Sequence, residues 1–158
     1  MKKLSMACYI IMNAKTYLST PSLKIIYHAF FHSGMSYRII LWGNLSHSST
    51  IFSMQKKTIR IMEGCGNRVS CRNLFKKLQI LPLTSQYMLS ILIFVVQNKN
   101  LFLTNIESHN IDTRQRNNLY LPQANLMICK RSKLFRDNLP LEIKKVTANL
   151  KKFKIALK

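Results

Sequence analysis

Acidic side chains are scarce in this sequence, and their scarcity excludes several classes of enzyme. The 158 residues contain five Asp and Glu in all, at Glu63, Glu107, Asp112, Asp137 and Glu142. Two-metal phosphoryl transfer needs clustered carboxylates, and glycoside hydrolysis needs a pair of them. Carboxylates this far apart in the sequence supply neither readily. No nucleophile–base pair is recognisable either, so we predict no catalytic residue and do not expect an enzyme.

Patterns for metals and disulfides are also missing. The four cysteines form no CxxC pair; they are Cys8, Cys65, Cys71 and Cys129. A chain that is neither short nor rich in cysteine favours free intracellular thiols over disulfides. Zinc bound by Cys65, Cys71 and a histidine is an alternative. A metal chelated by His28 and His32 is another, since their i, i+4 spacing suits it, but no Glu accompanies the two histidines. Structural roles are favoured for these residues, and we predict neither metal nor cofactor.

The chain has no long hydrophobic run. The apolar stretch from Met6 to Met12 follows two lysines, as in a signal peptide, but it is short and lacks a convincing cleavage site. The stretch from Tyr87 to Val96 has far fewer than the ~20 apolar residues that a bilayer needs. We therefore expect an intracellular protein of the nucleus or cytoplasm, neither secreted nor transmembrane.

Positive charge is abundant instead. There are 25 Lys and Arg, and the net charge is +20. Such a surplus destabilises a compact chain by self-repulsion unless a polyanion neutralises it. Nucleic acid is the commonest such partner, because neutralised phosphates release counterions. An anionic membrane surface is the alternative partner, and we favour nucleic acid.

Apolar residues recur at helical spacing along most of the chain and predict a mainly α protein. We expect a small irregular bundle of about five or six helices with a long polar loop. Residues 1–98 are the predicted helical region, residues 99–139 an irregular basic loop, and residues 140–158 an amphipathic helix. Within the first region, helices are expected at about residues 1–18, 21–42, 51–63, 71–78 and 84–98, the last with a strand over residues 91–96 as alternative.

The helix that ends before Gly64 has the clearest two-sided pattern. Its apolar half consists of Ile51, Phe52, Met54, Ile59, Ile61 and Met62, and a basic half carries Lys56, Lys57 and Arg60. Gly64 is the expected residue after the helix, where glycine adopts a left-handed conformation without strain. A solvated face is the alternative for the three cations, but the net charge of the chain favours contact with a polyanion.

Four sequence blocks suggest a family. They are SLKIIYHAFFHSGMSYRIILWGN, MQKKTIRIMEG, SCRNLFKKLQILPL, and NLPLEIK with the lysine-rich segment after it. In this order they resemble the C-terminal part, after the polymerase palm, of non-LTR retrotransposon reverse transcriptases of the LINE-like, jockey/RTE type. Roughly, the family pattern contains Y-G, W-G, Q-K-x-x-R and C-R-x-L-F, and the blocks span nearly the whole chain. One departure is Arg38, which stands where the pattern has glycine.

The resemblance implies a thumb-like helical region over residues 1–98, which grips template and primer downstream of the catalytic aspartates. Those aspartates are absent from the sequence, so it implies a non-catalytic fragment of an RNA-directed DNA polymerase with residual sequence-independent nucleic-acid binding. The implied partners are a nucleic-acid backbone and the palm domain of the parent protein. An independent basic helical protein that binds anionic membranes is the alternative. At the matching positions, the residues that face nucleic acid would be Lys56, Lys57 and Arg60, then Arg72, Lys76 and Lys77.

Overall fold

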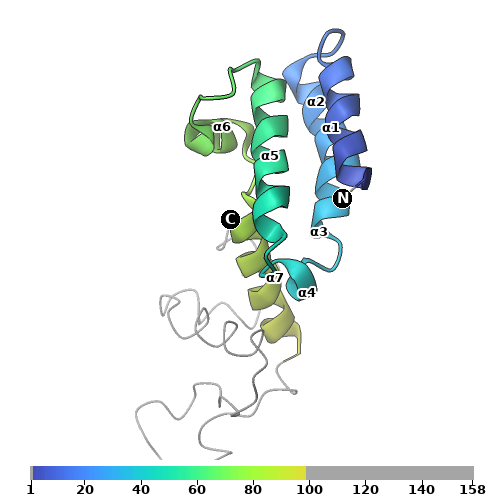
Figure 1. Ribbon diagram of the computed structural model, residues 1–158. Coiled ribbons are helices and arrows are strands. Elements are labelled where there is room, and N and C mark those ends of the chain that lie inside the picture. The colour runs from blue at the N-terminus through green and yellow to red at the C-terminus, as the bar shows by residue number, and fades with distance from the viewer. Residues whose placement is uncertain (1, 99–158) are drawn as a thin grey trace, which may run out of the picture. The chain divides into compact units, whose positions relative to one another are not determined.

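The computed structural model describes residues 2–98, which are mainly helical (Figure 1). The predicted fold class is confirmed, since these residues form six helices and no strand. The elements are α1 (Lys2–Ala14), α2 (Thr20–Ile26), η1 (Tyr27–His32), α3 (Ser33–Ser36), α4 (Ile39–Trp42), α5 (Ser48–Glu63), α6 (Cys71–Leu78) and α7 (Leu83–Gln97). The elements α2, η1 and α3 are one continuous helix with a π-helical turn in its middle. The predicted loop of residues 99–139 and the predicted helix of residues 140–158 lie outside the described residues.

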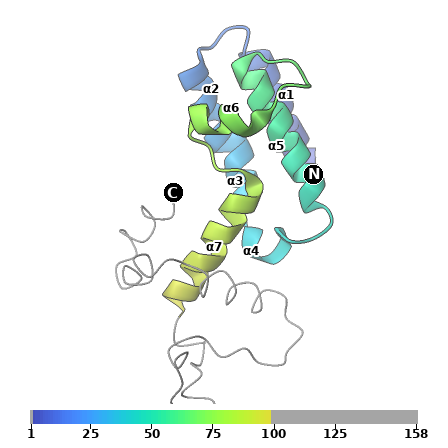
Figure 2. The ribbon, with the colours of Figure 1, turned by 90° about the vertical axis from the view of Figure 1, so that its left-hand side faces the viewer.

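Residues up to Tyr87 form one compact unit, whose core lies where α1, the α2–α3 helix and α5 meet (Figures 1 and 2). The α2–α3 helix contributes a stripe of fully buried side chains at four-residue spacing: Leu23, Tyr27, Phe31 and Met35. The Tyr27 and Phe31 rings stack with centroids 5.3 Å apart. Burying each such side chain stabilises the fold by about 1.5–3 kcal/mol, which holds the three helices together.

A buried glutamine, Gln55 of α5, links three parts of this unit. Its Nε2 donates to the Tyr27 Oη at 2.9 Å and to the Leu81 backbone oxygen at 3.0 Å. Its Oε1 accepts from the Leu83 backbone N–H at 2.9 Å. Because Leu83 opens α7, a side chain 28 residues away in sequence satisfies the first N–H of that helix. The sequence predicted the start of this helix at about residue 84, and α7 begins at Leu83.

Two predictions about buried faces need correction. In α5 the buried residues are Gln55, Thr58, Ile59 and Met62, whereas Ile51, Phe52, Met54 and Ile61 are only half-buried. Thr58 is tolerated in the core because its hydroxyl donates to the Met54 carbonyl at 2.9 Å and lies 2.9 Å from the Cys8 thiol. The first helix was predicted to run to about residue 18, but α1 ends at Ala14 and Leu18 is exposed.

The predicted helix from Pro21 to Trp42 is interrupted after Ser36. Arg38 adopts a left-handed conformation, with φ 49° and ψ 32°, and α4 begins at the next residue. The Trp42 indole Nε1 donates to the Tyr37 carbonyl at 2.8 Å and fastens the turn. A left-handed backbone is strained for residues that carry a Cβ, so the structure explains why glycine would suit this position.

Arg38→Gly should therefore stabilise the chain relative to Arg38→Ala, by about 1 kcal/mol. Both substitutions remove the contact of the Arg38 guanidinium with the Tyr37 ring, 5.3 Å from its centroid, and only glycine removes the strain. Thermal unfolding followed by circular dichroism measures the difference. A glycine variant that melts at or below the alanine variant would show that the turn is not strained.

Other predicted boundaries are confirmed. Gly64 ends α5 with φ 70°, α6 spans Cys71–Leu78 as predicted, and α7 is a helix rather than a strand over residues 91–96. Ile91 and Val95 are buried, as expected for this apolar helix. Within residues 2–98 no single helix is long and apolar enough to cross a bilayer. The pair α6 and α7, bent by 51° at the break between them, has the length and apolar composition of a membrane span only when the two helices are taken together.

Candidate nucleic-acid interface

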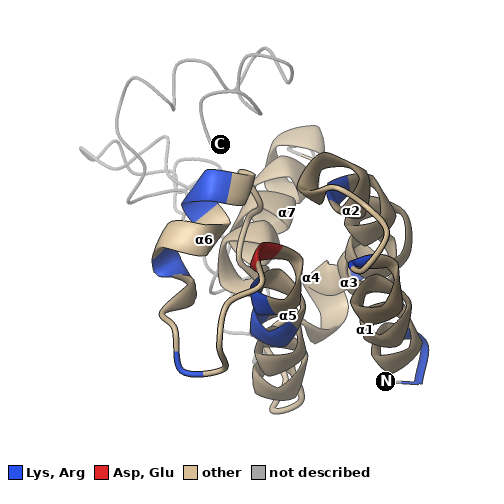
Figure 3. Cartoon of the chain, turned by 90° about the horizontal axis from the view of Figure 1, so that it is seen from above, with Lys and Arg blue, Asp and Glu red and all other residues tan. Residues whose placement is uncertain are grey.

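The helices α5 and α6 pack against each other and bring the six predicted site residues onto one pair of elements. The Phe52 and Phe75 rings stack with centroids 6.4 Å apart. The Cys71 thiol donates to the Lys56 backbone oxygen at 3.7 Å. On the other side of α5 lies α1 (Figures 1 and 3). The α5–α6 pair therefore has an outer surface that is separate from α1.

We call this surface the basic face: α5 from Lys56 onward, the loop of residues 64–70, and α6. Figure 3 shows its cations in blue along α5, the loop and α6, with one acidic residue, Glu63, at the end of α5. The cations are Lys56, Lys57, Arg60, Arg68, Arg72, Lys76 and Lys77. Seven cations with one carboxylate give this part of the chain a strongly positive potential.

Three of the seven cations contact other parts of the same unit. The Lys56 Nζ lies 4.2 Å from the centroid of the Phe52 ring, a cation–π contact. Arg60 Nε donates to the Val69 carbonyl at 2.9 Å and ties the loop to α5. Lys77 forms an ion pair with Glu63, and hydrogen bonding to that carboxylate raises the pKa of Lys77. The Lys56 contact lies within α5, whereas the Arg60 and Lys77 contacts hold the loop and α6 on α5.

The ion pair also neutralises Glu63, the only acidic residue of the basic face, whose side chain is shielded from solvent. The Glu63 side chain is 6% exposed, and its Oε2 is engaged by Lys77. A phosphate that approaches the face would therefore meet cations without an exposed carboxylate to repel it.

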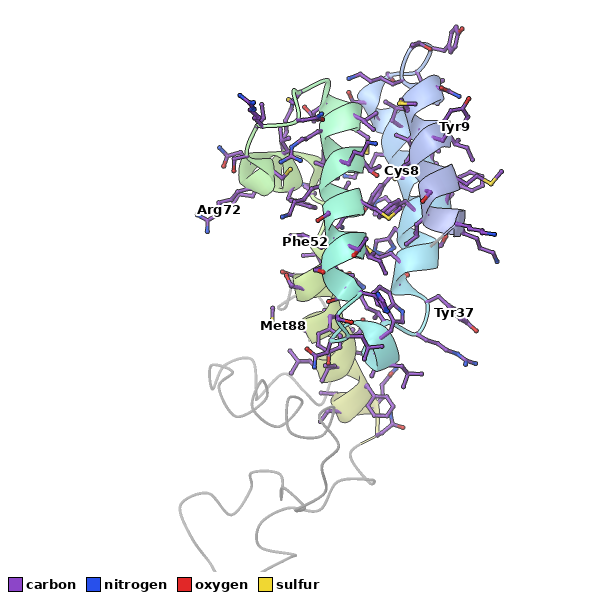
Figure 4. The ribbon with its side chains drawn as sticks, viewed as in Figure 1. Cys8, Tyr9, Tyr37, Phe52, Arg72 and Met88 are labelled. Atoms are coloured by element: carbon purple, nitrogen blue, oxygen red, sulfur yellow. The ribbon has the colours of Figure 1, made fainter. Side chains whose placement is uncertain are left out.

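Four cations remain directed at solvent. Lys57, Arg68, Arg72 and Lys76 are exposed, and none makes a hydrogen bond or ion pair with another described residue. Figure 4 shows Arg72 extending away from α6. Of the six predicted site residues, the structure thus leaves Lys57, Arg72 and Lys76 free to bind. Sequence reasoning missed Arg68, because a loop has no periodicity; its position between two basic helices was the available signal.

The residues considered for metal binding do not assemble into a site. Among residues 2–98, no group of three or more His, Cys, Asp or Glu is placed to hold a metal ion. The His28 and His32 rings lie 5.1 Å apart between centroids, and burial lowers the pKa of His32, opposed by a hydrogen bond with Gln86. Cys8, Cys65 and Cys71 are free thiols.

Comparison of the chain with known protein families, with curated proteins and with solved structures finds no match. The chemistry of the basic face is therefore the basis for assigning a function. Exposed ammonium and guanidinium groups on packed helices suit the phosphates of a nucleic-acid backbone, and such contacts carry no sequence information.

Proposed function

We propose that this chain binds nucleic acid without sequence preference, through phosphate contacts from the basic face. The observation that carries the proposal is the set of four solvent-directed cations, Lys57, Arg68, Arg72 and Lys76, on a surface whose one carboxylate is paired inward. Each cation that neutralises a phosphate releases counterions, which drives binding to any sequence. The same proposal makes the chain a non-enzymatic protein that acts inside the cell, where nucleic acid is found.

We further propose that the chain is a fragment of a non-LTR retrotransposon reverse transcriptase, from the region after the palm. The positions that fit the family pattern are ones on which the fold depends, and this supports the proposal. Gln55, in the Q-K element of that pattern, is the buried link between three segments. Gly43, in its W-G element, admits no side chain, because a Cβ there would lie 2.4 Å from Tyr87 Cδ2 and 2.7 Å from the Ile39 oxygen.

Chemical footprinting of lysines on the full chain tests the nucleic-acid proposal. Acetylation is followed by mass spectrometry with and without a saturating DNA duplex of mixed sequence. We expect the duplex to slow modification of Lys57 and Lys76 several-fold, because bound phosphates cover their ammonium groups. Lys2 and Lys3, exposed at the start of α1, are the internal control and should react at nearly unchanged rates. Equal protection at all four lysines, or none at Lys57 and Lys76, would contradict binding through the basic face.

A further inference from the structure

The outward face of α1 carries large apolar side chains that the core does not use. Met6 and Tyr9 are 67% and 60% exposed, and Met12 is 46% exposed. They follow one another at three-residue spacing, on the side of the helix away from the buried Leu4 and Ile11. Figure 4 shows Tyr9 pointing away from α5 while Cys8 points toward it. The helix therefore has apolar side chains on two faces, one against the core and one against solvent.

The charges around this face are of one sign. Lys2 and Lys3 are exposed at the beginning of α1, and the first acidic residue of the whole chain is Glu63, which is paired with Lys77. An apolar stripe beside cations, with no carboxylate on the same helix, complements a surface that is apolar inside and anionic at its boundary.

We propose that the outward face of α1 binds the surface of an anionic lipid bilayer, with the helix lying in the plane of the interface. Met6 and Met12 would enter the boundary between headgroups and acyl chains, because their side chains are flexible and apolar. The Tyr9 ring would lie beside them with its hydroxyl at headgroup level. The ammonium groups of Lys2 and Lys3 would contact lipid phosphates or carboxylates.

Other occupants fit this face less well. A second copy would bring together two chains that each carry a net charge of +20, with no described acidic side chain on α1 to offset the repulsion. Nucleic acid has no apolar surface to receive methionine side chains. It also has the basic face available, whose α6 lies on the other side of α5 from α1. The lipid proposal stands independently of the nucleic-acid proposal, because the two surfaces share no residue.

Vesicle co-sedimentation of the full chain tests the proposal. The vesicles contain phosphatidylcholine alone or with added phosphatidylserine. The test variant combines Met6→Gln, Tyr9→Gln and Met12→Gln, which keeps good helix formers at exposed positions. The matched control combines Ile25→Gln, Phe30→Gln and Leu41→Gln, three similarly exposed apolar residues on other elements. We expect the test variant to bind phosphatidylserine vesicles at least about tenfold more weakly than wild type, and the control within about twofold of it.

Two outcomes would overturn the proposal: equal binding by wild type and test variant, or a larger loss in the control. A spectroscopic readout adds a second test that does not depend on loss of binding. With phosphatidylserine vesicles, the added indole of a Tyr9→Trp variant should shift its emission to shorter wavelength, whereas that of a Phe30→Trp variant should not. No shift at position 9 would show that α1 does not enter the interface.

Discussion

Replacing Gln55 with leucine should lower the free energy of unfolding by about 3–5 kcal/mol, among the largest effects of any single substitution in the described region. The leucine fills a similar volume but leaves the Tyr27 hydroxyl, the Leu81 carbonyl and the Leu83 N–H without their partner. Tyr27 is fully buried, and burial raises its pKa to about 12, so its hydroxyl stays neutral and still needs a hydrogen bond. A single domain has roughly 5–15 kcal/mol of stability in total, so this loss removes much of it.

Denaturant unfolding followed by circular dichroism measures this effect. Ser53→Ala is the matched control, because Ser53 is exposed on the same helix. Its free energy of unfolding should stay within about 0.5 kcal/mol of wild type. Hydrogen exchange adds a local readout: the Leu83 amide should exchange much faster once Gln55 is replaced. A Gln55→Leu variant with wild-type stability would mean that the glutamine does not link these segments.

The second large effect is on binding. Substituting Lys57, Arg68, Arg72 and Lys76 together by alanine should reduce the slope of log affinity against log salt by about 3.6, since each phosphate contact on a duplex contributes about 0.9. When the salt rises from 50 to 200 mM, the affinity of wild type for a duplex should then fall by a factor about 150 times larger than the factor for the variant. Fluorescence anisotropy of a labelled duplex measures this. Because all four side chains are exposed, the melting temperature of the variant should stay close to that of wild type.

The local features of the fold could be predicted from the sequence because their causes are local. The α6 bounds follow from the apolar period and the polar turn before Cys71, and the end of α5 follows from Gly64. The direction of Arg72 and Lys76 also follows from helical spacing alone. In each case the residues that decide the structure lie within one or two helical turns of each other.

The features that sequence reasoning missed depend on partners far away in the chain. Gln55 looks like a polar residue at the edge of an amphipathic helix, and its partners lie 26 to 28 residues away. Likewise, the helical spacing of Arg60 gave no sign that Val69, beyond the end of the helix, would engage it. The three cations predicted on α5 therefore divide into Lys57, which is free, and Lys56 and Arg60, which contact a ring of α5 and the loop.

This division gives the most direct test of the account, a salt series of duplex binding for three full-length proteins. The first is wild type. The second has alanine in place of Lys57, Arg68, Arg72 and Lys76, and the third has alanine in place of Lys56, Arg60 and Lys77. If the solvent-directed cations bind the phosphates, the four-residue variant has a slope of log affinity against log salt that is shallower by about 3.6. The three-residue variant then keeps most of the wild-type slope but unfolds more easily. If both variants keep the wild-type slope, or the three-residue variant loses more of it than the four-residue variant, the basic face is not the nucleic-acid interface.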